Sequence, residues 1–303
     1  MKGKIKKIIT QFIPPIFLNI IKKSMSKTYD DCERWYDISG RKIKLPKNHK
    51  LDTFQKIFPT YDAFLPFLSK YLSNGYIIDI GANIGDTVYA MIDSGETKFL
   101  CVEPHPIFFR YLQENINKLT NKEKSRVSLI NKAIGTTKNI SLDINNGTSH
   151  RSNKGDVISE VISLDEVALN FNINEDKIEL IKIDTDGYDY DCILSGRNVL
   201  SRTNALIFYE NEFEDIDSLN NYVKAIEALL DNGYRNFYIF NNYGFFCANI
   251  VGKNILYFLN YYLNHKGKYK PEYYDILVCK DTKANFCDKI CERYSNEICN
   301  YRF

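Results

Sequence analysis

Short apolar runs alternate with amphipathic stretches along most of the chain. The apolar runs have the length of strands, and the stretches between them repeat apolar positions at the spacing of a helix. This alternation is typical of βαβ units and predicts a parallel sheet. Seven strands are predicted, at residues 76–80, 98–103, 127–134, 179–184, 205–210, 235–240 and 274–279.

Five helices are predicted from the same pattern, at residues 61–71, 86–93, 106–119, 188–200 and 217–231. The seventh strand follows a long excursion, and we expect it to enter the sheet antiparallel beside the fifth. The predicted fold class is therefore α/β, a Rossmann-like, seven-stranded, mostly parallel sheet with an antiparallel final strand and helices on both faces. Right-handed crossovers place the ligand crevice at the C-terminal ends of the first, second and fourth strands.

Residues 135–156 form a polar excursion with a strong turn signal at Asn145-Asn146-Gly147. Two interpretations are open. The segment is either a loop that shapes a substrate pocket or a hairpin without a functional role.

The first 30 residues differ from the rest of the chain in charge. Seven lysines and no acidic residue precede Asp30, whereas the net charge of all 303 residues is only +2. The apolar run at 8–21 is shorter than a membrane span and is broken by Pro14-Pro15. A basic, apolar segment of this kind is typical of contact with an anionic membrane surface, and a basic arm packed on the domain is the alternative. We expect this segment at 1–30 and a single domain at 31–303, with its core motifs at 61–212.

Eight cysteines follow no secretory signal, which indicates reduced thiols and a cytoplasmic protein, peripheral to the inner membrane if the N-terminal segment binds lipid. Cys287, Cys291 and Cys299 have helical spacing and lack the paired C-x2-C pattern of a zinc site, so no metal site is predicted. Basic residues form no stripe beyond the N-terminal segment. We therefore expect no nucleic-acid partner.

The first predicted strand runs directly into a glycine-containing turn, Asp79-Ile80-Gly81-Ala82-Asn83-Ile84-Gly85. The spacing G-x-x-x-G lacks the middle glycine of the nicotinamide fingerprint G-x-G-x-x-G, which disfavours a nicotinamide oxidoreductase. Asp79 would repel a phosphate, but it would tolerate a ligand with a cationic amino acid part. S-adenosylmethionine carries an ammonium and a sulfonium and no phosphate. Gly81 and Gly85 allow a tight turn and a close approach to such a ligand.

Two further acidic residues lie at predicted strand ends. Glu103 follows Gly81 by 22 residues, a distance typical of a carboxylate that accepts hydrogen bonds from ribose hydroxyls. Asp184 ends the apolar fourth strand, where an unpaired carboxylate needs a functional reason. The three strand ends together predict a site for S-adenosylmethionine.

The chain resembles the FkbM family of methyltransferases, which has the class I methyltransferase fold. The resemblance spans residues 61–212 and rests on the order and spacing of six segments. These are Ile78 to Gly85, Val102-Glu103-Pro104-His105-Pro106, Lys132-Ala133-Ile134-Gly135, Ser163-Leu164-Asp165-Glu166, Ile181-Lys182-Ile183-Asp184-Thr185-Asp186-Gly187 and Ile193-Leu194-Ser195-Gly196. The family more often has Glu-Gly where this chain has Asp186-Gly187, which puts a role for Asp186 in doubt.

The resemblance implies methyl transfer, usually to a hydroxyl of a natural product or a saccharide. It also implies roles for particular residues. Asp79, Gly81, Asn83 and Gly85 would line the methionine part of the cofactor, Glu103 would hold the ribose, His105 and Ala133 would lie near the adenine, and Asp184 would lie near the reacting methyl group.

A hydroxyl is a poor nucleophile, so a general base is expected, and the candidates are Asp184, His150 and Glu210. The predicted function is an O-methyltransferase that acts on a saccharide or glycoconjugate precursor, with S-adenosylmethionine as cofactor and a small-molecule or glycan acceptor as partner. The alternatives are a methyltransferase of a small secondary metabolite and a non-catalytic cofactor-binding scaffold. The sequence leaves the acceptor and the oligomeric state open.

Overall fold

The computed structural model describes residues 32–72, 74–93, 95–145, 148–152, 155–212, 216–265 and 273–300. The N-terminal segment 1–30 lies outside these ranges, so its predicted membrane contact stays a prediction. None of the helices in the described ranges is long and apolar enough to cross a membrane.

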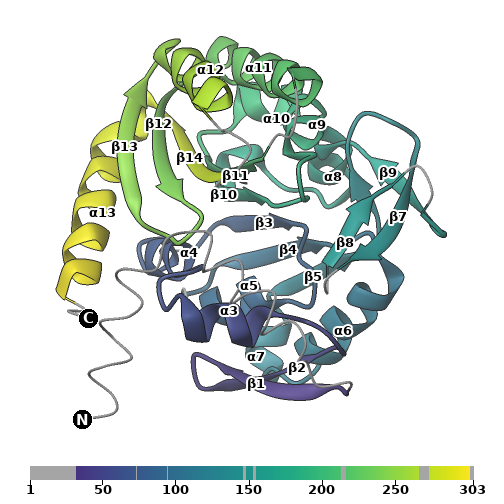
Figure 1. Cartoon of the computed structure of the whole chain (residues 1–303). Coiled ribbons are helices and arrows are strands. Elements are labelled where there is room, and N and C mark those ends of the chain that lie inside the picture. Colours follow the sequence, from purple (N-terminus) through teal and green to yellow (C-terminus); the bar gives the residue numbers. More distant parts are fainter. Residues whose placement is uncertain are drawn as a thin grey trace.

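An eight-stranded sheet forms the centre of the protein (Figure 1). Its order is β13-β12-β14-β11-β10-β3-β4-β5. The strands are β3 (Tyr76–Ile80), β4 (Lys98–Val102), β5 (Val127–Ile130), β10 (Ile178–Ile183), β11 (Leu206–Asn211), β12 (Tyr234–Asn241), β13 (Phe246–Val251) and β14 (Tyr274–Lys280). Strands β5, β4, β3, β10 and β11 are parallel neighbours, as in a Rossmann-like sheet. The final strand β14 lies antiparallel between β11 and β12, as predicted.

Helices cover both faces of this sheet, which confirms the predicted fold class. One face packs against α3 (Leu51–Ile57), α4 (Phe64–Ser69), α5 (Asp86–Met91), α6 (Pro106–Ile116) and α13 (Asp281–Asn300). The other face packs against α8 (Leu164–Asn170), α9 (Asp189–Leu194), α10 (Arg197–Arg202), α11 (Ile216–Asp231) and α12 (Asn254–His265). Alternate residues of each strand enter the two cores because side chains alternate across a sheet.

Two smaller sheets lie beside the central one. An N-terminal hairpin pairs β1 (Arg34–Ile38) with β2 (Arg41–Leu45), and a short helix, α7 (Asn121–Lys124), precedes β5. The second sheet has the order β6-β9-β7-β8 and consists of β6 (Ala133–Ile134), β7 (Asn139–Asn145), β8 (Thr148–Arg151) and β9 (Val157–Ile162). A 3-10 turn (Glu175–Lys177) leads into β10.

The strand count of seven was wrong, because β13 adds an eighth strand at the sheet edge. It forms a hairpin with β12 through a turn at Gly244, whose φ is +83°. The predicted strand 127–134 was also wrong as one element. Asn131 separates β5 from β6, and its amide Nδ2 donates hydrogen bonds to the carbonyls of Glu103 and Pro104.

Two predicted helices are shorter than their apolar patterns suggested. The pattern at 188–200 is divided into α9 and α10 at Gly196, where a Cβ would lie 2.6 Å from Leu164 Cδ2. The pattern at 61–71 becomes helical only from Phe64, because Asp62 has a φ of +56° and cannot belong to a right-handed helix. The late cysteines do lie on one helix, α13, and Cys287 and Cys291 are buried there.

Candidate functional site

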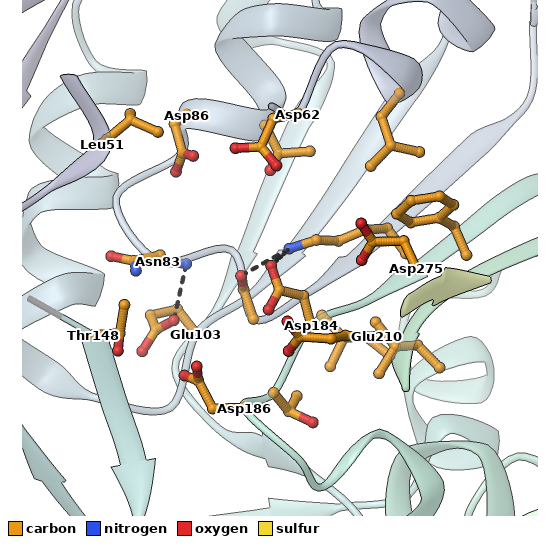
Figure 2. Close-up of a pocket in the computed structure, with 18 of the residues that line it drawn as sticks. Leu51, Asp62, Asn83, Asp86, Glu103, Thr148, Asp184, Asp186, Glu210 and Asp275 are labelled. Carbon is orange, nitrogen blue, oxygen red and sulfur yellow. Dashed lines mark hydrogen bonds and ion pairs between the residues drawn. The ribbon is translucent and has the colours of Figure 1, made fainter. Parts of the chain in front are cut away.

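A cavity of about 630 Å³ opens at the C-terminal ends of β3, β4, β10 and β11 (Figure 2). This is the predicted position of the crevice. In the close-up, Asn83, Glu103 and Thr148 lie on one side of Asp184 and Asp275 lies on the other. We divide the wall of the cavity accordingly. The glycine half is defined by Gly81, Asn83, Glu103, Ala133 and Thr148, and the carboxylate half by Tyr61, Asp62, Glu210, Tyr273 and Asp275.

Glu103 is held by backbone donors at the base of the glycine half. The backbone N–H of Asn83 donates to Glu103 Oε2 at 2.9 Å, and that of His105 donates to Oε1 at 2.8 Å. Each carboxylate oxygen keeps a further lone pair for a ligand hydroxyl. Burial raises the pKa of Glu103 to about 7, although both backbone hydrogen bonds oppose that rise. The arrangement suits recognition of a ribose diol.

The glycines of the turn are needed for packing inside the protein. Gly81 has a φ of +78°, and a Cβ there would lie 1.8 Å from the carbonyl oxygen of Asp184 on the neighbouring strand end. Gly85 has a φ of +89° and a Cβ would lie 2.8 Å from Leu112 Cδ1 on α6. Close approach to Asp184 and α6 therefore explains the G-x-x-x-G spacing on its own.

Lys182 is one of the residues at the site that the sequence analysis missed. It lies on β10 directly beside Asp79 of β3, and its side chain is only 5% exposed. Its Nζ is 3.1 Å from Asp79 Oδ1 and 3.2 Å from Asp184 Oδ2, and it donates a hydrogen bond to the Gly81 carbonyl at 3.0 Å. Burial by itself would lower the pKa of Lys182, but the two carboxylates outweigh it and raise this pKa. A lysine within an otherwise apolar strand was the available signal, since a buried lysine needs anionic partners.

Asp79 is fully buried behind Lys182 and is not part of the cavity wall. Burial raises the pKa of Asp79, and the Lys182 ammonium opposes that rise. The structure thus places Asp79 as the partner that holds Lys182 and, through Lys182, fixes the Gly81 carbonyl and Asp184. Its predicted direct contact with a methionine moiety stays a prediction.

The other predicted residues divide into those that line the cavity and those that do not. Cavity-lining residues are Gly81, Asn83, Glu103, Ala133, Asp184 and Glu210. Gly85 and His105 lie outside the wall, where Gly85 begins α5 and His105 caps α6 by accepting a hydrogen bond from the Ile107 N–H. His150 is also outside the wall, and its Nδ1 is 3.8 Å from Asp186 Oδ2, a cavity residue.

The polar excursion forms one side of the cavity. Its hairpin β7–β8 contributes Leu142, Thr148, Ser149 and Arg151 to the wall. Arg151 is anchored by Asp191 of α9, with 3.3 Å between Nη1 and Oδ2. The segment is therefore a hairpin whose strands line the cavity, and its role towards a substrate stays a prediction.

The carboxylate half combines segments that are far apart in the sequence. Asp62 precedes α4, Glu210 lies near the end of β11, and Asp275 lies at the start of β14. Burial is the main cause of a raised pKa for all three carboxyl groups, and their neighbouring carboxylates add to it. Asp62 and Asp275 were not recognised from the sequence, because no motif surrounds either residue.

Within the described ranges, no group of three or more His, Cys, Asp or Glu side chains is arranged to hold a metal ion. The excess of negative charge in the cavity suits a ligand that carries positive charge, as a sulfonium and an ammonium do.

The strand order defines a Rossmann-like α/β protein. The chain belongs to the FkbM methyltransferase family, because the model of the methyltransferase FkbM domain matches residues 79–236, about half of its length. The cofactor of this family is S-adenosylmethionine. Its cationic groups and its ribose fit the carboxylates of the cavity and the position of Glu103.

Solved structures give a weaker likeness, and no curated protein matches the chain. Methyltransferase FkbM from Methylobacillus flagellatus is 16% identical over 63% of this chain, with a TM-score of 0.38, and this chain covers 55% of that protein. P. horikoshii TYW2 in complex with MeSAdo is 14% identical, covering 83% of this chain and 73% of that one, with a TM-score of 0.44. Aeropyrum pernix fibrillarin with bound S-adenosyl-L-methionine is 12% identical, covering 81% and 82%, with a TM-score of 0.40. The assignment therefore rests on the family match and the strand order.

Proposed function

We propose that the protein is an S-adenosylmethionine-dependent O-methyltransferase that methylates a hydroxyl of a saccharide or glycoconjugate precursor. One observation carries the proposal: a single cavity joins the Glu103 site to a second compartment of carboxylates and tyrosines, with Asp184 between them. Carboxylates accept hydrogen bonds from sugar hydroxyls, and tyrosine rings offer apolar faces to sugar rings.

The residues of the glycine half would hold the cofactor. Glu103 would accept hydrogen bonds from the ribose hydroxyls, and the Gly81–Asn83 turn and Asp184 would flank the amino acid part. When bound, the cofactor supplies a methyl group on a sulfonium, which is already activated for displacement. The task of the protein is then to align the acceptor oxygen with that methyl group and to remove the hydroxyl proton.

Glu210 is the base that the geometry favours. It lies in the carboxylate half, and the direction of its pKa, raised by burial and by Asp184 and Asp189, makes it a stronger base than an ordinary glutamate. Asp184 is less suited, because its carboxylate is already engaged in an ion pair, with 3.2 Å between its Oδ2 and Lys182 Nζ. His150 is outside the cavity wall. In the proposed step the acceptor oxygen forms the new bond to carbon, the electrons of the broken carbon–sulfur bond stay on sulfur, and the hydroxyl proton moves to Glu210.

The test is transfer of a labelled methyl group from S-adenosylmethionine to a panel of methyl glycosides and hydroxylated metabolites. The expected result is label in an ether of a sugar hydroxyl. Label found only in non-sugar metabolites would show that the acceptor is a small secondary metabolite and not a saccharide. Tight cofactor binding without transfer to any acceptor would contradict catalysis and favour a cofactor-binding scaffold. Glu227→Gln, an exposed change on α11, is the matched control when Glu210 or Glu103 is replaced by glutamine.

We also propose that residues 1–30 bring the enzyme to the inner membrane surface, with the domain in the cytoplasm. The support is the seven lysines around an apolar run. Sedimentation with vesicles that contain anionic lipid tests this on the full chain and on a form that lacks residues 1–27. Equal pelleting of the two forms would overturn it.

A further inference from the structure

Two carboxylates of the cavity wall lie directly opposite each other on neighbouring strands. Glu210 on β11 and Asp275 on β14 are register partners in an antiparallel pair. Like charges in such a position repel each other and destabilise the sheet. Asp62 approaches from the segment before α4, and Figure 2 shows its carboxyl group lining the same cavity as Glu210 and Asp275.

Within the described ranges, these carboxyl groups have no partners that would explain their position. Glu210 is 8% exposed, and its side chain makes no hydrogen bond or ion pair with any residue in the described ranges. The carboxyl groups of Asp62 and Asp275 likewise make none there. Other acids of the site contrast with them: Asp79 and Asp184 have Lys182, and Asp189 accepts hydrogen bonds from the N–H and the hydroxyl of Thr185.

The nearby cation is already engaged. Lys182 opposes the raised pKa of Asp62 and of Asp275, but its Nζ is within 3.2 Å of Asp79 and of Asp184 and donates to the Gly81 carbonyl. An anion placed in the carboxylate half would therefore meet three carboxyl groups, and the described residues offer it no free cation there. A hydroxyl or an ammonium would instead supply the hydrogen-bond donors that these groups lack.

We infer that the carboxylate half selects an acceptor ring that bears hydroxyl or ammonium groups and rejects one that bears a carboxylate or a phosphate. Glu210, Asp275 and Asp62 are the specificity-determining residues. The inference rests on the proposed function, since it assigns this half of the cavity to the methyl acceptor. It narrows the substrate class to neutral sugars and amino sugars and excludes uronates and sugar phosphates at the methylated ring.

The test uses probes that need no knowledge of the acceptor. Three analogues of the cofactor carry a nitrogen in place of sulfur and an alkyl arm in place of the methyl group. The arms have equal length and end in an ammonium, a hydroxyl or a carboxylate. Calorimetry should rank the affinities ammonium above hydroxyl above carboxylate, with roughly tenfold or more between the ends of the series. Equal affinities, or a preference for the carboxylate arm, would overturn the inference.

Two variants test whether Asp275 and Asp62 determine the selectivity among the three probes. Asp275→Asn and Asp62→Asn should each reduce the ratio between the ammonium and carboxylate probes by roughly threefold or more, whereas Asp231→Asn, an exposed change at the end of α11, should leave it unchanged. An unchanged ratio in both folded cavity variants would contradict the assignment. Binding of S-adenosylhomocysteine separates the two proposals. If neither S-adenosylhomocysteine nor the three probes bind, the proposed function fails. If S-adenosylhomocysteine binds and the three probes bind with equal affinity, only the inference fails.

Discussion

The two halves of the cavity differ in how the chain builds them. The glycine half comes mainly from neighbouring strand ends and turns, and backbone groups fix its central acid, Glu103, with hydrogen bonds from Asn83 and His105. The carboxylate half brings together Asp62, Glu210 and Asp275 from distant parts of the chain, and no residue that the structure describes anchors their side chains in this way. The proposed cofactor site is thus fixed by backbone hydrogen bonds, whereas the proposed acceptor site depends on individual side chains.

The largest effect should follow from Glu210→Gln, because it removes the proposed base from the carboxylate half. We expect kcat to fall about 100- to 10,000-fold while cofactor affinity changes little. Rates measured against pH check the assignment. The wild-type rate should rise with pH through the raised pKa of Glu210, since the base must be ionised, and this limb should be absent in the variant. If Glu210→Gln turned over at the wild-type rate, Glu210 would not be the general base.

A stability change should follow from Lys182→Met, because Asp79 would remain buried without its cation. The expected loss in the free energy of unfolding is about 3–5 kcal/mol, measured by denaturant titration. Adding Asp79→Asn should recover much of the loss, since the remaining pair would carry no buried charge. If Lys182→Met alone is as stable as the wild type, the ion pair does not stabilise the fold.

Glu103→Gln tests the glycine half by itself. Loss of a charged acceptor from the ribose site should weaken S-adenosylmethionine binding roughly 10- to 100-fold in calorimetry. The arm selectivity of the three probes should stay as in the wild type, because the carboxylate half is untouched. If Glu103→Gln changed the selectivity among the three probes and left the affinity for S-adenosylmethionine unchanged, the roles assigned to the two halves would be wrong.

The smallest effect concerns Asp186, whose pKa is raised to about 8 by burial and by Asp184, Asp189 and Glu212. A raised pKa in the folded state stabilises the protein fully below the ordinary value of 3.8, and this contribution is lost as the pH rises towards 8. Asp186→Asn should therefore raise Tm by roughly 1–3 °C above pH 8 and by less in acid. A rise that is larger in acid than above pH 8 would contradict this sign.

Much of the central sheet could be predicted from the sequence, because its strands are apolar and bounded by clear turns. The antiparallel entry of β14 beside β11 followed from chain order. The eighth strand, β13, could not be recognised within the surrounding run of aromatic residues. Its residues alternate between partly buried and exposed, because β13 lies at the edge of the sheet, and only the tertiary structure defines that edge. The end of β5 was missed because Asn131 ends the strand through side-chain hydrogen bonds, which a hydrophobic pattern does not record.

The site shows the same division. Glu103 and the Gly81 turn could be predicted because their spacing along one βαβ unit reflects a local geometry. The pairing of Lys182 with Asp79 depends on the register of β10 against β3, and the pairing of Glu210 with Asp275 depends on the register of β11 against β14. Sequence spacing carries no information on register between strands that are distant in the chain.

A crystal structure of the protein with S-adenosylhomocysteine tests the division into two halves most directly. We expect the ribose hydroxyls to lie within hydrogen-bond distance of Glu103. We expect the sulfur to lie near Asp184 and to face the carboxylate half. A nucleoside bound among Asp62, Glu210 and Asp275, or a ribose away from Glu103, would contradict it.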